Sequence, residues 1–165
     1  MRLLALSALA FSLATPAVAA PIEQPFSGRR PLTLGVHAGF AWYGNGVAFG
    51  ARLGVPLVHN GFVSTINNSV YLSVGADVYN ADYGGSRGFA VGVPVALQWN
   101  FYFSEEWSAF VEAGFNLYFD DSGRDPYYYN WGIGAIGGRY KFSDTVAVQL
   151  RLGSPYSALG IVIDL

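Results

Sequence analysis

Charged and amide side chains recur at alternate positions along much of this chain, and these residue types could perform chemistry. Histidine and carboxylates can transfer protons, whereas arginine and lysine can pair with carboxylates. If the alternation holds, all of them point to one side of the strands that carry them. The residues on that side are His37, Arg52, Asp77, Glu112, Arg139, Lys141, Gln149, Arg151 and Asp164. They could form a network of paired charges or a polar path.

One subset of polar residues could be catalytic in principle. His37, Ser73 and Asp77 share the same side and have the types needed for a base, a nucleophile and an orienting acid. Their spacing gives no support to this interpretation, because His37 falls in mid-strand and the other histidine, His59, falls in a turn. We therefore predict no catalytic residues and no enzyme.

Two further patterns resemble binding sites. Gly132 to Gly137 matches the glycine spacing of a dinucleotide-binding loop, but no strand-turn-helix unit surrounds it. Asp120, Asp121 and Asp125 loosely resemble a cation site, although a solvated acidic loop explains them better. The chain has 2 histidines and no cysteine, which gives no ligand cluster for a metal. We expect neither a cofactor nor a metal.

Hydrophobic residues repeat with a period of two from residue 32 onward. In the first repeat, Leu34 and Val36 alternate with Gly35 and His37. Such alternation is typical of a strand with two unlike faces. Turn-forming residues such as Gly44-Asn45-Gly46 separate the repeats. Eight strands are expected, at 32–42, 47–57, 70–79, 89–101, 107–119, 129–142, 146–153 and 158–165.

Two of these segments depart from a regular strand. The sixth has Ile133 and Ala135 on its apolar side and then loses its phase near Gly137-Gly138. A bulge there would return Tyr140 to the apolar side. Pro94 stands in the middle of the fourth segment and cannot donate to a strand ladder, which predicts a bulge or a local kink.

The composition of the two strand faces indicates whether water or lipid surrounds these strands. One face is apolar and, with the bulge in place, carries no charged side chain. The other face is mostly Gly, Ala, Ser and Asn with about one charge per strand, and it would be a poor surface in water. It suits the interior of a narrow eight-stranded barrel, which has room for side chains only. The pattern predicts an all-β fold, a closed antiparallel up-and-down transmembrane β-barrel; the alternative is a soluble periplasmic lipocalin-like barrel.

Aromatic residues collect near the ends of the predicted strands. Amphipathic rings favour the headgroup zone of a bilayer, so two aromatic girdles are expected, one at each rim of the barrel. The first girdle would contain Trp42, Tyr79, Phe89, Phe119, Tyr129 and Trp131. The second would contain Trp99, Phe101, Trp107, Tyr140 and Phe142.

Composition and the N-terminal residues agree with an exported protein. The chain is 52% hydrophobic and 12% charged, against roughly 25% charged in a typical soluble domain. Its net charge of −2 offers no basic surface to a nucleic acid. A positive start, a short apolar stretch and small residues before Pro21 are typical of a secretory signal peptide. We expect a signal peptide at 1–20, a short periplasmic segment at 21–31 and the barrel at 32–165.

The predicted architecture resembles the small outer-membrane barrels of the OmpA and OmpX type. The resemblance rests on the signal peptide, the alternating strands, the aromatic girdles and a last strand from Leu159 to Leu165. It implies residence in the outer membrane of a Gram-negative cell, contact with its lipid, and insertion by the barrel-assembly machinery. Some small barrels of this kind modify lipid, but their His-x-Ser motif and amphipathic N-terminal helix are not seen here.

For function, the sequence favours a structural or interaction role, with the interior plugged by the charged network. A narrow channel for small or apolar solutes and a lipid-modifying enzyme are the alternatives. An even number of strands would put both ends of the barrel domain on the periplasmic side. The expected outer loops are then 43–46, 80–88, 120–129 and 154–157. Nothing in these loops identifies a protein partner, extracellular or periplasmic.

Overall fold

The alternating segments form eight antiparallel strands, and each strand pairs with its neighbours in sequence. The computed structural model describes residues 21–41, 46–83, 86–120 and 129–165. It begins with a 3-10 turn, η1 (Pro21–Glu23). The strands are β1 (Thr33–Ala41), β2 (Val47–Val58), β3 (Asn68–Tyr83), β4 (Ser86–Tyr102), β5 (Trp107–Asp120), β6 (Tyr129–Lys141), β7 (Val146–Ser154) and β8 (Tyr156–Asp164).

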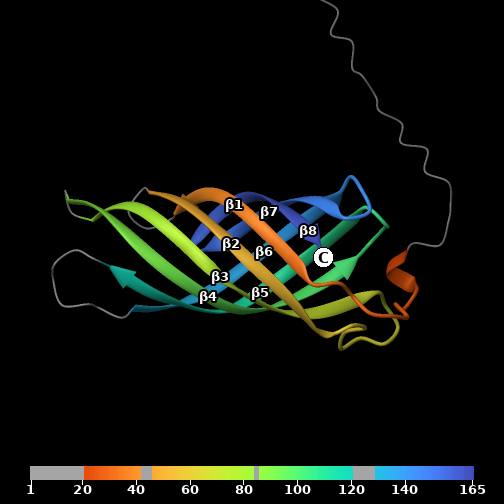
Figure 1. Cartoon of the computed structure of the whole chain (residues 1–165). Coiled ribbons are helices and arrows are strands. Elements are labelled where there is room, and N and C mark those ends of the chain that lie inside the picture. The colour runs from red at the N-terminus through yellow and green to blue at the C-terminus, as the bar shows by residue number, and fades with distance from the viewer. Residues whose placement is uncertain (1–20, 42–45, 84–85, 121–128) are drawn as a thin grey trace, which may run out of the picture.

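Pairing of the first strand with the last closes the sheet into a barrel (Figure 1). Val36 of β1, for example, lies opposite Ala51 of β2 on one side and Ile161 of β8 on the other. The predicted fold class, an all-β closed antiparallel up-and-down barrel, is confirmed. In the four ranges that the structure describes, no helix has the length and apolar character needed to cross a bilayer.

The alternation sorts side chains into an apolar outer surface and a polar interior. Outward residues are large, apolar and exposed, as at Val36 (54% exposed) and Phe89 (70%). Inward residues on the same strands are small or polar and buried, including Arg52, Asp77 and Glu112. This is the reverse of an ordinary soluble protein, in which the large apolar side chains fill the core.

The N-terminal segment and the C-terminus lie at the same end of the barrel, here named the terminal end (towards the right in Figure 1). β1 begins and β8 ends there, and the Leu165 amide donates to the Leu32 carbonyl. The segment before β1 is fixed at this end, because the Asn67 amide donates to the Ile22 carbonyl at 2.7 Å. The predicted signal peptide lies outside the described residues and stays a prediction.

The β2–β3 connection folds back over the outer surface at the terminal end. The Asn68 amide group donates to the carbonyls of Val63 and Ile66, and Phe62 meets Trp99 edge to face. Val70, which pairs with Trp99, lies on the outer face as expected, yet it is buried.

Two of the predicted loops are largely strand. β3 and β4 continue through most of 80–88, where Asp82 pairs with Arg87. Two strands of a long hairpin can stay paired beyond the barrel even where their residues are polar. Such a segment is rich in turn-forming residues, so its sequence predicts a loop. At the predicted loop 154–157, β7 runs to Ser154 and β8 begins at Tyr156, so the connection is Pro155 alone. Residues 42–45, 84–85 and 121–128, which hold other predicted loop positions, lie outside the described residues.

The predicted bulge in the sixth strand is wrong. β6 pairs with β5 and β7 in one unbroken register, from Trp131 opposite Asn116 to Tyr140 opposite Trp107. Ile133 and Ala135 therefore point inward and are buried, in phase with Arg139. Glycine carries no side chain, so it does not show which face of a strand is apolar. The sequence of this strand has four such positions, Gly132, Gly134, Gly137 and Gly138.

The predicted bulge at Pro94 is absent, but the pairing of β4 with β3 is interrupted there, between Val95–Val74 and Gly92–Asp77. Pro94 pairs with Asn116 of β5, and β4 keeps one register with β3 on either side of it. Its ring points inward and is fully buried. The register shift among the described strands lies instead between Pro56 and Val58 of β2.

The predicted girdle residues are distributed unevenly. Phe89, Phe119, Trp107, Tyr140 and Phe142 are exposed at strand ends, and the Trp107 and Tyr140 rings lie 4.8 Å apart. Trp99 and Phe101 are half-buried and touch, with centroids 4.7 Å apart. Trp42 lies outside the described residues, as do the side chains of Tyr129 and Trp131.

Tyr79 does not belong to a girdle. It is 3% exposed and points into the barrel, in phase with Asp77 two residues earlier. The alternation of the third predicted strand already required Tyr79 to point inward. The girdle prediction relied only on the position of Tyr79 near the end of that strand. A girdle residue needs both a strand end and the outward phase.

Candidate functional site

Glycines on neighbouring strands make room for the long polar side chains of the interior. His37 lies opposite Gly50 of β2 and Gly160 of β8. Arg52 lies opposite Gly35 of β1 and Gly75 of β3. Because glycine has no side chain, each long residue can cross the lumen beside it. The small side chains of the inner face are therefore part of the site.

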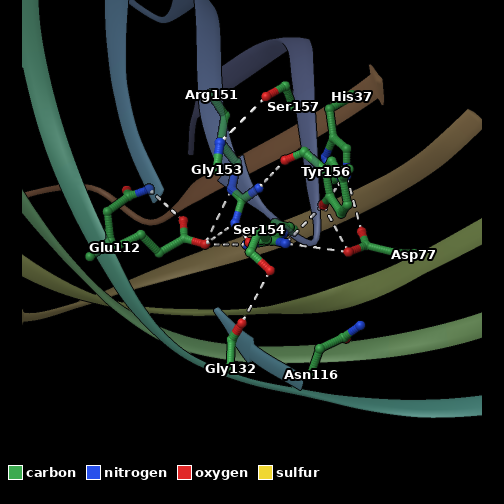
Figure 2. Close-up of polar contacts among 12 residues, drawn as sticks. His37, Asp77, Glu112, Asn116, Gly132, Arg151, Gly153, Ser154, Tyr156 and Ser157 are labelled. Carbon is green, nitrogen blue, oxygen red and sulfur yellow. Dashed lines mark hydrogen bonds and ion pairs between the residues drawn. The ribbon is translucent and has the colours of Figure 1, made fainter. Parts of the chain in front are cut away.

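Tyr156 lies at the centre of the polar contacts. Its hydroxyl oxygen is 2.7 Å from His37 Nε2 and 2.8 Å from both Asp77 Oδ2 and Arg52 Nη2. Its ring stacks on the His37 imidazole, with centroids 5.3 Å apart. Figure 2 shows the Tyr156 ring beside His37 and its hydroxyl close to Asp77.

These contacts favour a proton on His37 Nε2. The one Tyr156 hydroxyl proton goes to the Asp77 carboxylate, while the hydroxyl oxygen accepts from Arg52. His37 Nε2 is 3.0 Å from Asp77 Oδ1 and 2.7 Å from the Tyr156 oxygen, and both of those atoms can accept. A proton on Nε2 therefore suits both contacts.

Glu112 joins the two buried arginines. Its Oε1 accepts from Arg52 Nη1 at 2.8 Å and from Arg151 Nη2 at 3.1 Å, while its Oε2 accepts from Gln98 Nε2 at 3.2 Å. Arg151 also donates to the backbone carbonyls of Tyr156 (2.6 Å) and Ser154 (2.9 Å), where β7 turns into β8. Side chains from four strands, β2, β4, β5 and β7, are thus tied together across the lumen.

We name this group the central network. It comprises His37, Arg52, Asp77, Glu112, Arg151 and Tyr156. Two guanidiniums face two carboxylates, and the Asp77 side chain is fully buried. An unpaired ion in such a place would cost several kcal/mol, so each of these charges needs a partner. Tyr79 and Asn116 extend the network, since Asn116 Nδ2 donates to Tyr79 Oη at 3.0 Å and Tyr79 Oη donates to Asp77 at 3.2 Å.

Arg139 forms a second group nearer the terminal end. Its guanidinium donates to Gln149 Oε1 and Gln98 Oε1, both at 2.6 Å, and to Asn100 Oδ1 at 3.4 Å. It also lies over the Phe110 ring, 5.2 Å from the centroid. Gln98 bonds to both Arg139 and Glu112, so it links this group to the central network.

Most of the predicted interior residues belong to the central network or to the Arg139 group, and one pair lies apart from both. Lys141 and Asp164 bind each other at 2.7 Å at the terminal rim, where both are partly exposed. Ser73, the possible nucleophile, does not join His37 and Asp77. It precedes Asp77 by four residues, and a strand rises about 3.3 Å per residue, so the two are separated by about 13 Å along β3.

Sequence reasoning missed the central residue, Tyr156. Ser154-Pro155 is typical of a turn, so the sequence predicts a loop that includes Tyr156. The signal was available, because the inward phase of Ala158, Gly160 and Val162 extends back to position 156.

The interior is open at the terminal end and closed further in. A cavity of about 490 Å³ lies at that end, between the N-terminal segment, the β4–β5 turn and Arg139. We name it the vestibule. Beyond Arg139, a void of about 30 Å³ lies beside Arg52 and Glu112, and it has space for one or two water molecules.

A glycine beside the central network supplies a direct test of its packing. A Cβ built on Gly50 would collide with Asp77 Oδ1 and lie 2.8 Å from His37 Nε2. We expect Gly50→Ala to lower the free energy of unfolding by about 1–3 kcal/mol, since one added carbon overpacks a filled core. Chemical denaturation of the refolded protein measures this change.

Gly138→Ala is the matched control. A Cβ on Gly138 would lie 3.8 Å from the Ser108 carbonyl oxygen, in ordinary contact. If both variants lose the same stability, the polar contacts at Gly50 are not the cause.

Comparison with protein-family models and with curated proteins finds no match to this chain. The proposals below therefore rest on the geometry of the barrel.

Proposed function

We propose that this chain is an integral outer-membrane barrel of the OmpA and OmpX type, with a structural or interaction role. Its outer surface contacts lipid tails, and the central network closes its interior. The terminal end faces the periplasm. Residues 1–20 act as the signal peptide that directs export, and the barrel-assembly machinery inserts the strands.

The observation that carries this proposal is the sorting of charge between the two faces. Every charged strand residue whose side chain is described points inward or to the terminal rim, namely Arg52, Asp77, Glu112, Arg139, Lys141, Arg151 and Asp164. Most outer positions of the same strands carry apolar side chains, with Asn68, Asn80 and Ser157 among the exceptions. A soluble monomer rarely exposes an apolar patch beyond a few hundred Å², and here the patch follows the strands around the barrel.

The soluble, lipocalin-like alternative fits this sorting poorly. Such a barrel would hold an apolar ligand in an apolar interior, whereas two arginines and two carboxylates fill this one. Its outer surface would also need charges for solubility. Fractionation of cells that express the full chain separates the two proposals.

We expect the protein in the outer-membrane fraction, and we expect its mobility on a denaturing gel to shift on boiling. A closed barrel resists detergent until heated, because each strand is paired on both sides. Recovery in the soluble periplasmic fraction, with no heat shift, would contradict the proposal.

Closure of the interior predicts a protein that does not conduct. We expect no steady single-channel conductance in planar bilayers, because the central network spans the lumen and leaves a void for one or two waters. The boiled protein serves as the control for contaminants. Stable conductance from the folded protein would instead support the narrow-channel alternative.

A further inference from the structure

The vestibule contains two arginines that no carboxylate neutralises in the described part of the chain. Arg139 donates to three side-chain amide oxygens, from Gln98, Asn100 and Gln149. Arg30 donates to the His59 carbonyl at 3.2 Å and to the Asn67 side chain. Both line the same cavity of about 490 Å³. The amides supply hydrogen bonds but no negative charge, so neither guanidinium forms an ion pair with a carboxylate of the described residues.

The chain holds Arg30 firmly in this place. Its guanidinium lies between two rings, 3.7 Å from the centroid of Phe26 and 3.9 Å from that of Tyr102. Its backbone amide donates to His59 Nδ1 at 2.9 Å. Burial lowers the pKa of the Arg30 guanidinium, yet an arginine keeps its charge at neutral pH. Such preorganisation is typical of a binding group, since little side-chain entropy is lost when a ligand binds.

Both guanidiniums have N–H groups left for a ligand. Arginine carries five N–H donors, and Arg139 uses one on each of its three nitrogens. Arg30 uses one on Nε and one on Nη2. Planar forks of this kind match the geometry of carboxylates and phosphates.

The other charged residues that line the vestibule are one lysine and three carboxylates, and none of them pairs with Arg30 or Arg139. Lys141 pairs with Asp164 at 2.7 Å, so these two neutralise each other. Glu105 and Glu106 are exposed in the β4–β5 turn, where water and salt screen them. The inner wall between the charged groups is apolar or aromatic, with Tyr71, Ala147 and Val162.

We propose that the vestibule binds a small organic anion. Its carboxylate or phosphate group pairs with Arg139 and Arg30, and its apolar part lies against Tyr71, Ala147 and Val162. The volume suits a small molecule, since ligand pockets span about 300–1,000 Å³. The central network closes the far side, so the anion is held and not conducted. This inference does not depend on the membrane location of the barrel.

The test is calorimetric titration of the folded protein in an uncharged detergent. The probes are benzoate and phenyl phosphate, with benzyl alcohol as the uncharged control. We expect saturable binding of at least one anion with a Kd of about 1 mM or lower, and much weaker binding of the alcohol. A preference between the two anions identifies the head group. Absence of saturable binding, or equal binding of benzyl alcohol, would overturn the proposal.

Variants locate the site. Arg139→Gln and Arg30→Gln should each weaken anion binding by about tenfold or more, since each removes a charge-assisted hydrogen bond. Arg29→Gln is the matched control, because Arg29 is exposed next to Arg30 and does not line the vestibule. Arg30 precedes the barrel, so its variant keeps the test valid even if Arg139→Gln fails to fold. Anion binding that neither vestibule variant weakens would refute the assignment.

Discussion

Replacing Glu112 with glutamine is expected to lower the free energy of unfolding by about 3–5 kcal/mol, the range for removing one partner of a buried ion pair. The variant leaves Arg151 without a carboxylate partner among the described residues and leaves Arg52 with Asp77, at 3.3 Å. Glutamine keeps the size of the side chain, so the loss reports charge and not volume. Urea unfolding of the refolded protein, followed by tryptophan fluorescence, measures it.

Glu106→Gln is the control for this change. Glu106 lies exposed in the β4–β5 turn, and its carboxylate accepts from Ser104 Oγ at 2.9 Å. Exposed polar contacts of this kind contribute little, so the expected change is below about 1 kcal/mol. A Glu112→Gln variant as stable as the control would show that the central network does not hold the barrel together.

Introducing a lysine on the outer face should have the second largest effect. Val36 lies near the middle of β1 and is 54% exposed. If lipid surrounds it, Val36→Lys should lower the free energy of folding into bilayers by about 2–4 kcal/mol, the cost of a lysine near the midplane. Folding yields in lipid vesicles across a denaturant series measure this cost.

Thr145→Lys adds the same charge in the exposed turn between β6 and β7, and it should change the folding free energy little. In a soluble barrel, by contrast, lysine at Val36 would stand in water and would be neutral or would improve solubility. Equal folding of the two variants into vesicles would therefore argue against a lipid-facing outer surface.

The strands and their faces could be predicted because the period of two depends on nothing beyond neighbouring residues. Val36, Phe49 and Leu97 repeat in a phase that local geometry alone sets. The prediction failed in β6, where four glycines carry no phase and where Ile133 points inward against the general rule. Only pairing with β5 and β7 fixes the direction of that strand.

The pairing within the central network could not be predicted from spacing. The sequence placed His37, Arg52 and Asp77 on one face, but which of them meet depends on the register of β1, β2 and β3. Tyr156 was missed because Pro155 is typical of a turn, and a connection of one residue leaves Tyr156 within a strand. The vestibule could not be predicted for a related reason, since Arg30 and Arg139 line one cavity only when the barrel closes.

The most direct measurement of the outer surface is the collision rate of spin labels with oxygen and with a water-soluble nickel chelate. The chain has no cysteine, so single cysteines at Val36, Leu97, Ile161 and Thr145 can each carry one label. In lipid vesicles, labels at the first three positions should collide mainly with oxygen, and the label at Thr145 mainly with the chelate. Outer-face labels that collide mainly with the chelate would contradict the assignment of this surface to lipid.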